Sequence, residues 1–140
     1  MKVNIYTFTT AKKPINFTAG TAFVIECITS KGPATLSHTG KLENVTRNQA
    51  EIYCLIEALR KLNKPCELEI YASNAFTAAV LNDYLPKWEA NGWKTSKGED
   101  VIELYKELKN LLKPHKFHGE NGINSYTEWL TREAQKEAEK

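Results

Sequence analysis

The first forty residues alternate between hydrophobic and polar positions in a way that is typical of β-strands. Strands are predicted at residues 2–8, 21–30 and 34–39, because these segments are rich in β-branched and aromatic residues. Lys31-Gly32-Pro33 separates the second segment from the third, and Gly and Pro between apolar runs favour a reversal of the chain. The three segments are therefore predicted to form an antiparallel meander.

Residues 46–62 instead carry the periodicity of an amphipathic helix. Its apolar positions fall at i, i+3, i+4, i+7 and i+10, which places them on one face: Ile52, Leu55, Ile56, Leu59 and Leu62. Thr46, followed three residues later by Gln49, fits a capping box at the start of this helix. Asn63-Lys64-Pro65 is expected to end it.

Short strands and helices follow in the second half of the chain. We expect strands at 66–71 and 116–118, and helices at 74–85, 102–112 and after Asn124, which would cap the last of them. Pro86 is expected to break the first of these helices, and residues 88–98 form a short polar segment. The inward residues of the last helix are predicted to be Tyr126, Trp129, Leu130 and Ala134. This order of elements predicts an α/β fold, a mixed sheet covered by helices, in a single domain over residues 1–140.

Composition narrows the class of protein without naming a partner. The chain has 140 residues, of which 41% are hydrophobic and 26% charged, with a formal net charge of +2. That balance is typical of a globular protein and neither requires nor excludes nucleic acid. No apolar run approaches the roughly 18 residues that a membrane span needs. Cys27, Cys54 and Cys66 lack metal-ligand spacing and the first residues do not resemble a signal peptide, so we expect reduced thiols in a cytoplasmic protein.

Four short strings, in order along the chain, resemble motifs of type 1 ribonuclease H. They are Ile5-Tyr6-Thr7 in the first strand, Thr46-Arg47-Asn48-Gln49-Ala50-Glu51 at the first helix, Asn91-Gly92-Trp93-Lys94-Thr95 with Trp88 before it, and Lys116-Phe117-His118 with Asn124 and Glu128 beyond. The resemblance covers nearly the whole chain. It implies the ribonuclease H-like fold, a five-stranded mixed sheet of three antiparallel strands and then parallel strands, flanked by helices.

The same resemblance implies a catalytic centre in which four carboxylates hold two Mg²⁺ ions across the scissile phosphate of an RNA strand paired with DNA. Here Phe8 and Ser73 occupy two of the four positions, while Glu51 and Glu128 keep a carboxylate. His118 matches the family's proton-shuttling histidine. Glu51 and Glu128 could hold Mg²⁺ or Mn²⁺ only weakly, if at all, because each lost carboxylate removes both a ligand and charge. An aromatic ring at Phe8 also lowers the polarity that the ions need.

The resemblance further implies a surface for nucleic acid. The candidate contact residues are Arg47, Asn48, Gln49, Asn74, Trp93, Lys94 and Lys97. Simpler roles stay open for several candidates: Gln49 is explained by the capping box, Glu128 by an i,i+4 pair with Arg132, and Trp93 by packing. Phe8 is likewise explained by packing. Glu51 is explained as an acidic residue in the first turn of a helix, where the helix dipole favours it.

Three functions are compatible with these residues. The leading interpretation is a ribonuclease H-like protein that binds RNA/DNA hybrid or double-stranded RNA, with an impaired or absent two-metal nuclease site. The alternative is an active RNA/DNA-hybrid endoribonuclease with an atypical site built on Glu51, Glu128 and His118. The second alternative is a protein-interaction module on the same fold.

Overall fold

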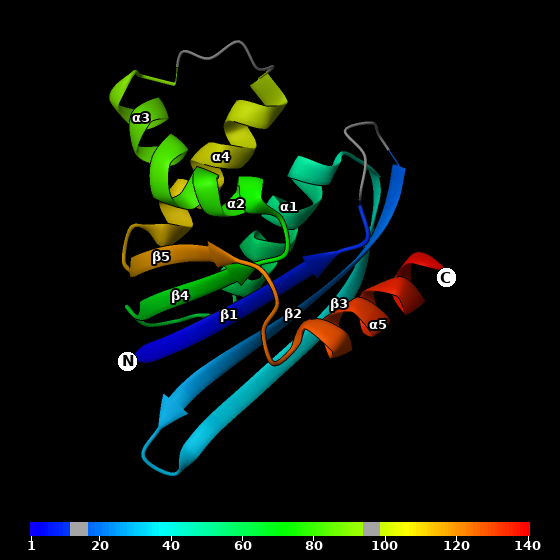
Figure 1. Cartoon of the computed structure of the whole chain (residues 1–140). Helices are drawn as coiled ribbons and strands as arrows, with labels where there is room; N and C mark the ends of the chain where they lie inside the picture. Colours follow the sequence, from blue (N-terminus) through cyan, green and yellow to red (C-terminus); the bar gives the residue numbers. More distant parts are fainter. Residues whose placement is uncertain (12–16, 94–98) are drawn as a thin grey trace.

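A five-stranded sheet in the order β3-β2-β1-β4-β5 forms the centre of the molecule (Figure 1). The structure is a computed structural model that describes residues 1–11, 17–93 and 99–140. The strands are β1 (Lys2–Thr9), β2 (Phe17–Thr29), β3 (Gly32–Val45), β4 (Glu67–Ala72) and β5 (Lys116–Asn121). β1, β2 and β3 pair antiparallel, whereas β4 runs parallel to both β1 and β5. The predicted mixed sheet is confirmed.

The β2–β3 hairpin is much longer than the sequence pattern predicts. Pairing extends from Phe17 opposite Val45 to Thr29 opposite Gly32, with an irregularity between Phe17 and Ala19. β3 is one of the two edge strands of the sheet, and most of its residues are exposed. Backbone pairing with β2 supports such a strand even where no hydrophobic alternation marks it. The hairpin consequently extends beyond the end of β1 (Figure 1).

One face of the sheet is covered by helices. They are α1 (Arg47–Leu59), α4 (Glu99–Leu112) and the consecutive short helical segments α2 (Ala75–Ala79), η1 (Val80–Tyr84) and α3 (Leu85–Ala90) (Figure 1). The main core lies between them and includes Val3, Ile5, Ile52, Leu55, Ile70 and Leu108, each at most 1% exposed. The predicted capping box begins α1. The backbone N–H of Gln49 donates to Thr46 Oγ1, and that of Thr46 donates to Gln49 Oε1.

The prediction that Pro86 breaks the helix is wrong. The chain continues through a π-helical segment, in which the N–H of Leu85 donates to the carbonyl of Val80, and then into α3. Pro86 lies in the first turn of α3, where its missing N–H costs little. As a result Trp88 falls within α3 instead of a polar segment, and its ring packs 4.7 Å from that of Tyr105.

The opposite face is covered by α5 (Thr127–Ala138), which packs over β2 and the adjoining parts of β1 and β3 (Figure 1). A smaller cluster forms here and contains Tyr126, Trp129, Leu130 and Ala134, as predicted. The helix begins at Thr127 and is not capped by Asn124. Asn124 instead accepts a hydrogen bond from the N–H of Tyr126 (2.8 Å), which stabilises the turn before the helix. Among the described residues, no helix is both long and apolar enough to cross a bilayer.

We expect Gly20→Ala to destabilise the protein by at least about 2 kcal/mol, because α5 approaches β2 closely at this residue. A Cβ at Gly20 would lie 1.8 Å from the backbone oxygen of Ala134, so the helix would have to move. Urea unfolding followed by circular dichroism measures the change. Gly40→Ala is the matched control, since a Cβ there meets only the side-chain Oγ1 of Thr21 at 3.2 Å. Equal stability of the two variants would contradict this account of helix docking.

Candidate active site

The carboxylate of Glu51 is fully buried at the point where α1 crosses the ends of β1 and β4. Its Oε2 accepts hydrogen bonds from Thr7 Oγ1 (3.1 Å), from the N–H of Ser73 (2.9 Å) and from Ser73 Oγ (2.6 Å). Its Oε1 accepts from the N–H of Asn74 (2.8 Å). Both oxygens are therefore occupied by donors from β1 and from the turn after β4.

Two opposing effects act on the protonation of this group. Burial raises the pKa of Glu51, because a carboxylate loses the solvation of water, and the hydrogen bonds from Ser73, Asn74 and Thr7 lower it in part. Burial is the larger effect, so the pKa lies above its usual value. Thr7 was not among the predicted site residues; its position one residue before Phe8, on the opposite face of β1, was the available signal.

Phe8 points to the other side of β1. It packs against the α5 cluster with Tyr6 and Val24, whereas Thr7 turns towards α1 and Glu51. The backbone carbonyl of Phe8 lies 4.0 Å from the Sγ of Cys54. The side chain of Phe8 is thus part of the packing between the sheet and α5.

Ser73 and Asn74 form the turn between β4 and α2. Besides binding Glu51, Asn74 uses Oδ1 to accept from the N–H of Phe76 (2.9 Å), which caps α2, and Nδ2 to contact Asn48 Oδ1 at 3.3 Å. The start of α1 and the start of α2 are therefore linked by the side chains of Asn48 and Asn74.

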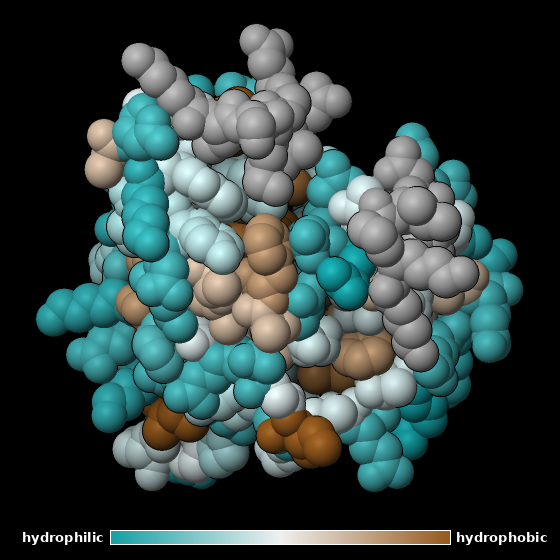
Figure 2. All heavy atoms as spheres, turned by 45° about the horizontal axis from the view of Figure 1, so that its top comes forward, coloured by the Kyte–Doolittle hydropathy of each residue, from teal (hydrophilic) through white to brown (hydrophobic). Residues whose placement is uncertain are grey.

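A hollow of about 360 Å³ lies at this end of the sheet. Its lining residues are Phe8, Thr9, Ala11, Arg47, Ser73, Asn74 and Ala75. Of these described lining residues only Arg47 is charged, and it is exposed at the first position of α1. In Figure 2, which turns the top of the molecule forward, tan and brown atoms lie in the middle of the face between teal ones. The hollow combines one cation with neutral and apolar groups.

Glu128 is exposed in the first turn of α5. Its spacing suggested an ion pair with Arg132, but the structure does not contain this pair. Arg132 Nε instead lies 3.6 Å from Glu133 Oε2. In the described part of the chain Glu128 has neither a hydrogen bond nor an ion pair through its side chain.

His118 lies in the middle of β5, on the face of the sheet opposite Glu51. It is the register partner of Glu69 on β4, and its Nδ1 lies 3.3 Å from Glu69 Oε2 and 3.8 Å from Glu120 Oε1. Phe117 and Gly119 take the other face, where Phe117 packs against the main core. The structure therefore brings His118 together with Glu69 and Glu120, which the sequence analysis did not select, and not with Glu51.

The remaining candidate contact residues differ in what they already bind. Gln49 is engaged in the capping box. Trp93 is partly buried against the main core, and its backbone N–H donates to the backbone carbonyl of Trp88 at 2.7 Å. Arg47 has no ion pair in the described ranges. Lys94 and Lys97 lie outside the described residues.

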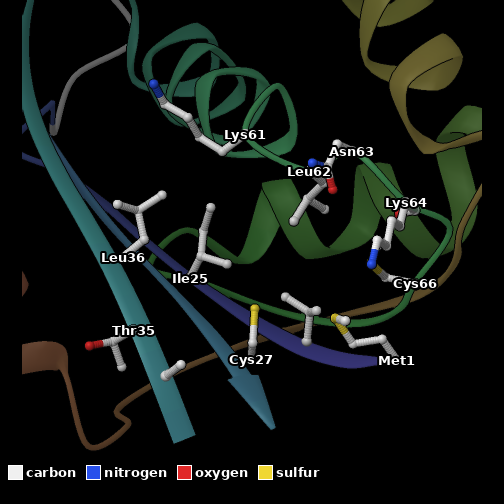
Figure 3. A pocket seen from close by; sticks show the side chains of 12 residues that line it. Met1, Ile25, Cys27, Thr35, Leu36, Lys61, Leu62, Asn63, Lys64 and Cys66 are labelled. Carbon is white, nitrogen blue, oxygen red and sulfur yellow. The ribbon is translucent and has the colours of Figure 1, made fainter. Parts of the chain in front are cut away.

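Another hollow, about 390 Å³ and lined largely by apolar side chains, lies at the other end of β1 (Figure 3). Side chains from β2, β3 and the segment after α1 line it, among them Cys27, Leu36 and Leu62. None of the predicted site residues is part of its lining. It is a second concavity, separate from the residues that the resemblance selects.

Comparisons with known proteins identify the family. The RNase H family profile matches residues 2–121. The chain belongs to the ribonuclease H family. It is 37% identical over 87 residues to ribonuclease H of Cupriavidus pinatubonensis, a match that spans 59% of this chain and 60% of that protein. It is 34% identical over 105 residues to ribonuclease H of Caldicellulosiruptor saccharolyticus, spanning 68% of this chain and 72% of that protein.

A solved structure shares the fold. LC11-RNase H1, determined in complex with an RNA/DNA hybrid, superposes with a TM-score of 0.70 at 19% identity and covers 99% of this chain and 97% of that one. The predicted ribonuclease H-like fold is confirmed by this similarity and by the strand order.

The ribonuclease H family uses divalent metal ions, so the four positions can be tested for their fit to such an ion. Magnesium takes an octahedral shell of oxygen atoms at about 2.0–2.1 Å. The oxygens of Glu51 already accept hydrogen bonds from Thr7, Ser73 and Asn74, and Phe8 offers no ligand. Arg47 adds positive charge to the hollow. This donor set does not fit a magnesium ion, and we derive no catalytic step through one.

We expect Glu51→Gln to lower the free energy of unfolding by about 1–3 kcal/mol. The N–H groups of Ser73 and Asn74 donate to different oxygens of Glu51, and an amide has only one oxygen to offer. One backbone N–H would therefore face an NH₂ group. Glu57→Gln on the same helix, where Glu57 is exposed and pairs with Arg60, is expected to change stability by less than about 0.5 kcal/mol.

The pH dependence of this difference has a definite sign. Because the folded pKa of Glu51 is raised, the folded protein binds a proton that the unfolded chain has lost, and this contribution to stability is present at low pH. It is lost as the pH rises through the folded pKa. Hydrogen bonds from Asn4 and Tyr126 lower the pKa of Glu26 and give the opposite trend, so the profile of Glu51→Gln must be subtracted from that of the wild type. A difference that grows as the pH rises would contradict the prediction.

Proposed function

We propose that this protein binds a nucleic-acid duplex containing an RNA strand, either an RNA/DNA hybrid or double-stranded RNA, without hydrolysing it by a two-metal mechanism. The observation that carries the proposal is the lining of the hollow at the ends of β1 and β4. Among the described residues that line it, Arg47 is the one that carries a charge, while Glu51 is turned into the core. A site of this charge attracts phosphate and repels metal ions.

The start of α1 supports phosphate binding in a second way. The first turn of the helix contains no acidic residue, and Arg47 is its first residue. The N-terminus of an α-helix carries partial positive charge from its free N–H groups, which favours an anion. The arginine and the helix end therefore act in the same direction on a sugar-phosphate backbone.

Family membership supports the choice of duplex. LC11-RNase H1, which has the same fold, was solved in complex with an RNA/DNA hybrid, and the similarity covers 97% of that protein. Asn48 and Asn74 border the same region and carry amide groups that can bond to 2′-hydroxyls, the feature that distinguishes an RNA strand.

Loss of the two-metal reaction follows, in this proposal, from the combination of Phe8, Ser73 and the hydrogen-bonded Glu51. Glu128 keeps an exposed carboxylate, but one carboxylate cannot bridge two ions across a phosphate. We also propose a cytoplasmic location, for which the free thiols of Cys27, Cys54 and Cys66 are suited.

We expect Arg47→Ala to weaken hybrid binding and to reduce the slope of log K against log[salt] by about one, because each phosphate contact releases about one counterion. Fluorescence anisotropy with labelled RNA/DNA hybrid, double-stranded RNA and double-stranded DNA measures both quantities. Arg60→Ala is the matched control, since Arg60 lies at the other end of α1 and pairs with Glu57 and Glu107. Equal slopes for the two variants would place the duplex elsewhere, and absence of binding to any duplex would favour a protein-interaction module.

We expect the double variant Phe8→Asp, Ser73→Asp to gain a metal site that the wild type lacks. Ser73 Oγ lies 2.6 Å from Glu51 Oε2, so an aspartate there places two carboxylates side by side, and a divalent cation relieves the repulsion. We expect saturating Mg²⁺ to raise the melting temperature of this variant by about 5 °C or more and to produce cleavage of hybrid.

The wild type and Ser37→Asp, a charge added at an exposed position of β3, are the controls for this experiment. Neither is expected to respond to Mg²⁺ or to cleave hybrid. Metal-dependent cleavage by the wild type would overturn the proposal and make the protein an endoribonuclease with an unusual ligand set.

A further inference from the structure

A second group of side chains with potential metal ligands lies on the same face of the sheet as α5, on strands that this helix does not cover. It consists of Glu69 on β4 with His118 and Glu120 on β5. Their side chains are 47%, 54% and 53% exposed. Glu51 belongs to the opposite face, and the hollow next to it, at the end of the sheet, contains none of these three residues in its lining, so this group is separate from the site described above.

The backbone fixes the arrangement of the three residues. His118 and Glu120 are two residues apart on one strand, so their side chains point to the same face, and Glu69 is the register partner of His118 on the neighbouring strand. One ligand atom from each residue lies within 4.8 Å of the others. Nothing in the main chain has to move for the three groups to converge.

The two distances from His118 to the carboxylates are close to those between neighbouring ligand atoms in a coordination sphere. Tetrahedral bonds of about 2.0–2.1 Å to nitrogen and oxygen place neighbouring ligand atoms about 3.3 Å apart. The Nδ1 of His118 lies 3.3 Å from Glu69 Oε2 and 3.8 Å from Glu120 Oε1. Small side-chain rotations therefore suffice to place all three atoms around one ion.

Ion pairing within the protein engages only part of this group and leaves the other carboxylate oxygens to solvent. A single ring nitrogen carries one proton and can donate it to only one of the two carboxylates. In the described ranges neither Glu69 nor Glu120 has another hydrogen-bond or ion-pair partner. Lys2 and Lys116 border the same hollow as Glu69 and His118 but form no ion pair with either acid. A divalent cation satisfies all three side chains at once.

We propose that Glu69, His118 and Glu120 bind a divalent transition-metal ion of the Zn²⁺ type. One imidazole and two carboxylates form a ligand set that such ions prefer over Mg²⁺. Three protein ligands leave a coordination position open, as in zinc sites that also bind water or a small anion. The hollow of about 440 Å³ beside His118 has room for that fourth ligand. This inference does not depend on the proposed binding of nucleic acid.

The test is a titration of the reduced full chain with Zn²⁺ in competition with a chromophoric chelator. His118→Ala, Glu69→Gln and Glu120→Gln are each expected to weaken Zn²⁺ binding at least about tenfold, because each removes one ligand. Glu43→Gln is the matched control: it removes the same charge from an exposed residue of β3, at the other edge of the sheet, and is expected to change the affinity less than about twofold. Lower pH should weaken binding, since protons compete for the ligands.

Two results would overturn the proposal. The first is an affinity for Zn²⁺ that is the same in the wild type and in His118→Ala. The second is an intense thiolate-to-metal charge-transfer band on adding Co²⁺, which would place the ion on Cys27 or Cys66 instead. All four substitutions are at the protein surface, and circular dichroism of each variant verifies that the fold is retained.

Discussion

The buried carboxylate of Glu51 is the contact on which this end of the molecule depends. An ionisable group with no exposed surface is tolerated in a core only when its oxygens are matched by donors, and here Thr7, Ser73 and Asn74 supply them. These donors come from β1 and from the turn after β4, so one side chain of α1 joins three elements that are distant in sequence. The same hydrogen bonds hold both oxygens of Glu51 against the protein.

The two faces of the sheet divide the chemistry of the protein. On the α1 face, the large apolar core ends at Glu51, and the hollow beside it presents Arg47 to solvent. On the other face, α5 covers β2 and its neighbours, while β4 and β5 present charged side chains that include Glu69 and His118. Successive side chains of β1 point to opposite faces of the sheet. Thr7 therefore contacts Glu51, whereas Phe8 packs under α5. The cationic Arg47 and the cluster of Glu69, His118 and Glu120 therefore lie at different places on the sheet.

Local signals in the sequence were reliable where the physics is local. The capping box of Thr46 and Gln49 is present as predicted, and the inward face of α5 holds the expected residues. Expectations were wrong where a neighbouring element took over. β3 is longer than its pattern because it pairs along the whole of β2, and the helix passes Pro86 because a π-turn shifts the hydrogen bonds around it. Asn124, predicted to cap the last helix, instead stabilises the turn before it.

The sequence by itself determined the family and the mixed sheet and selected the candidate site residues, since motifs and hydrophobic periodicity are properties of short stretches of chain. Only the tertiary structure decided what those residues contact. Strand register and burial by distant elements decide three of these contacts. They are the hydrogen bonds to the buried Glu51, the face of β1 on which Phe8 lies, and the contact of His118 with Glu69 and Glu120. Such contacts are fixed when the sheet assembles, and no periodicity along the chain encodes them.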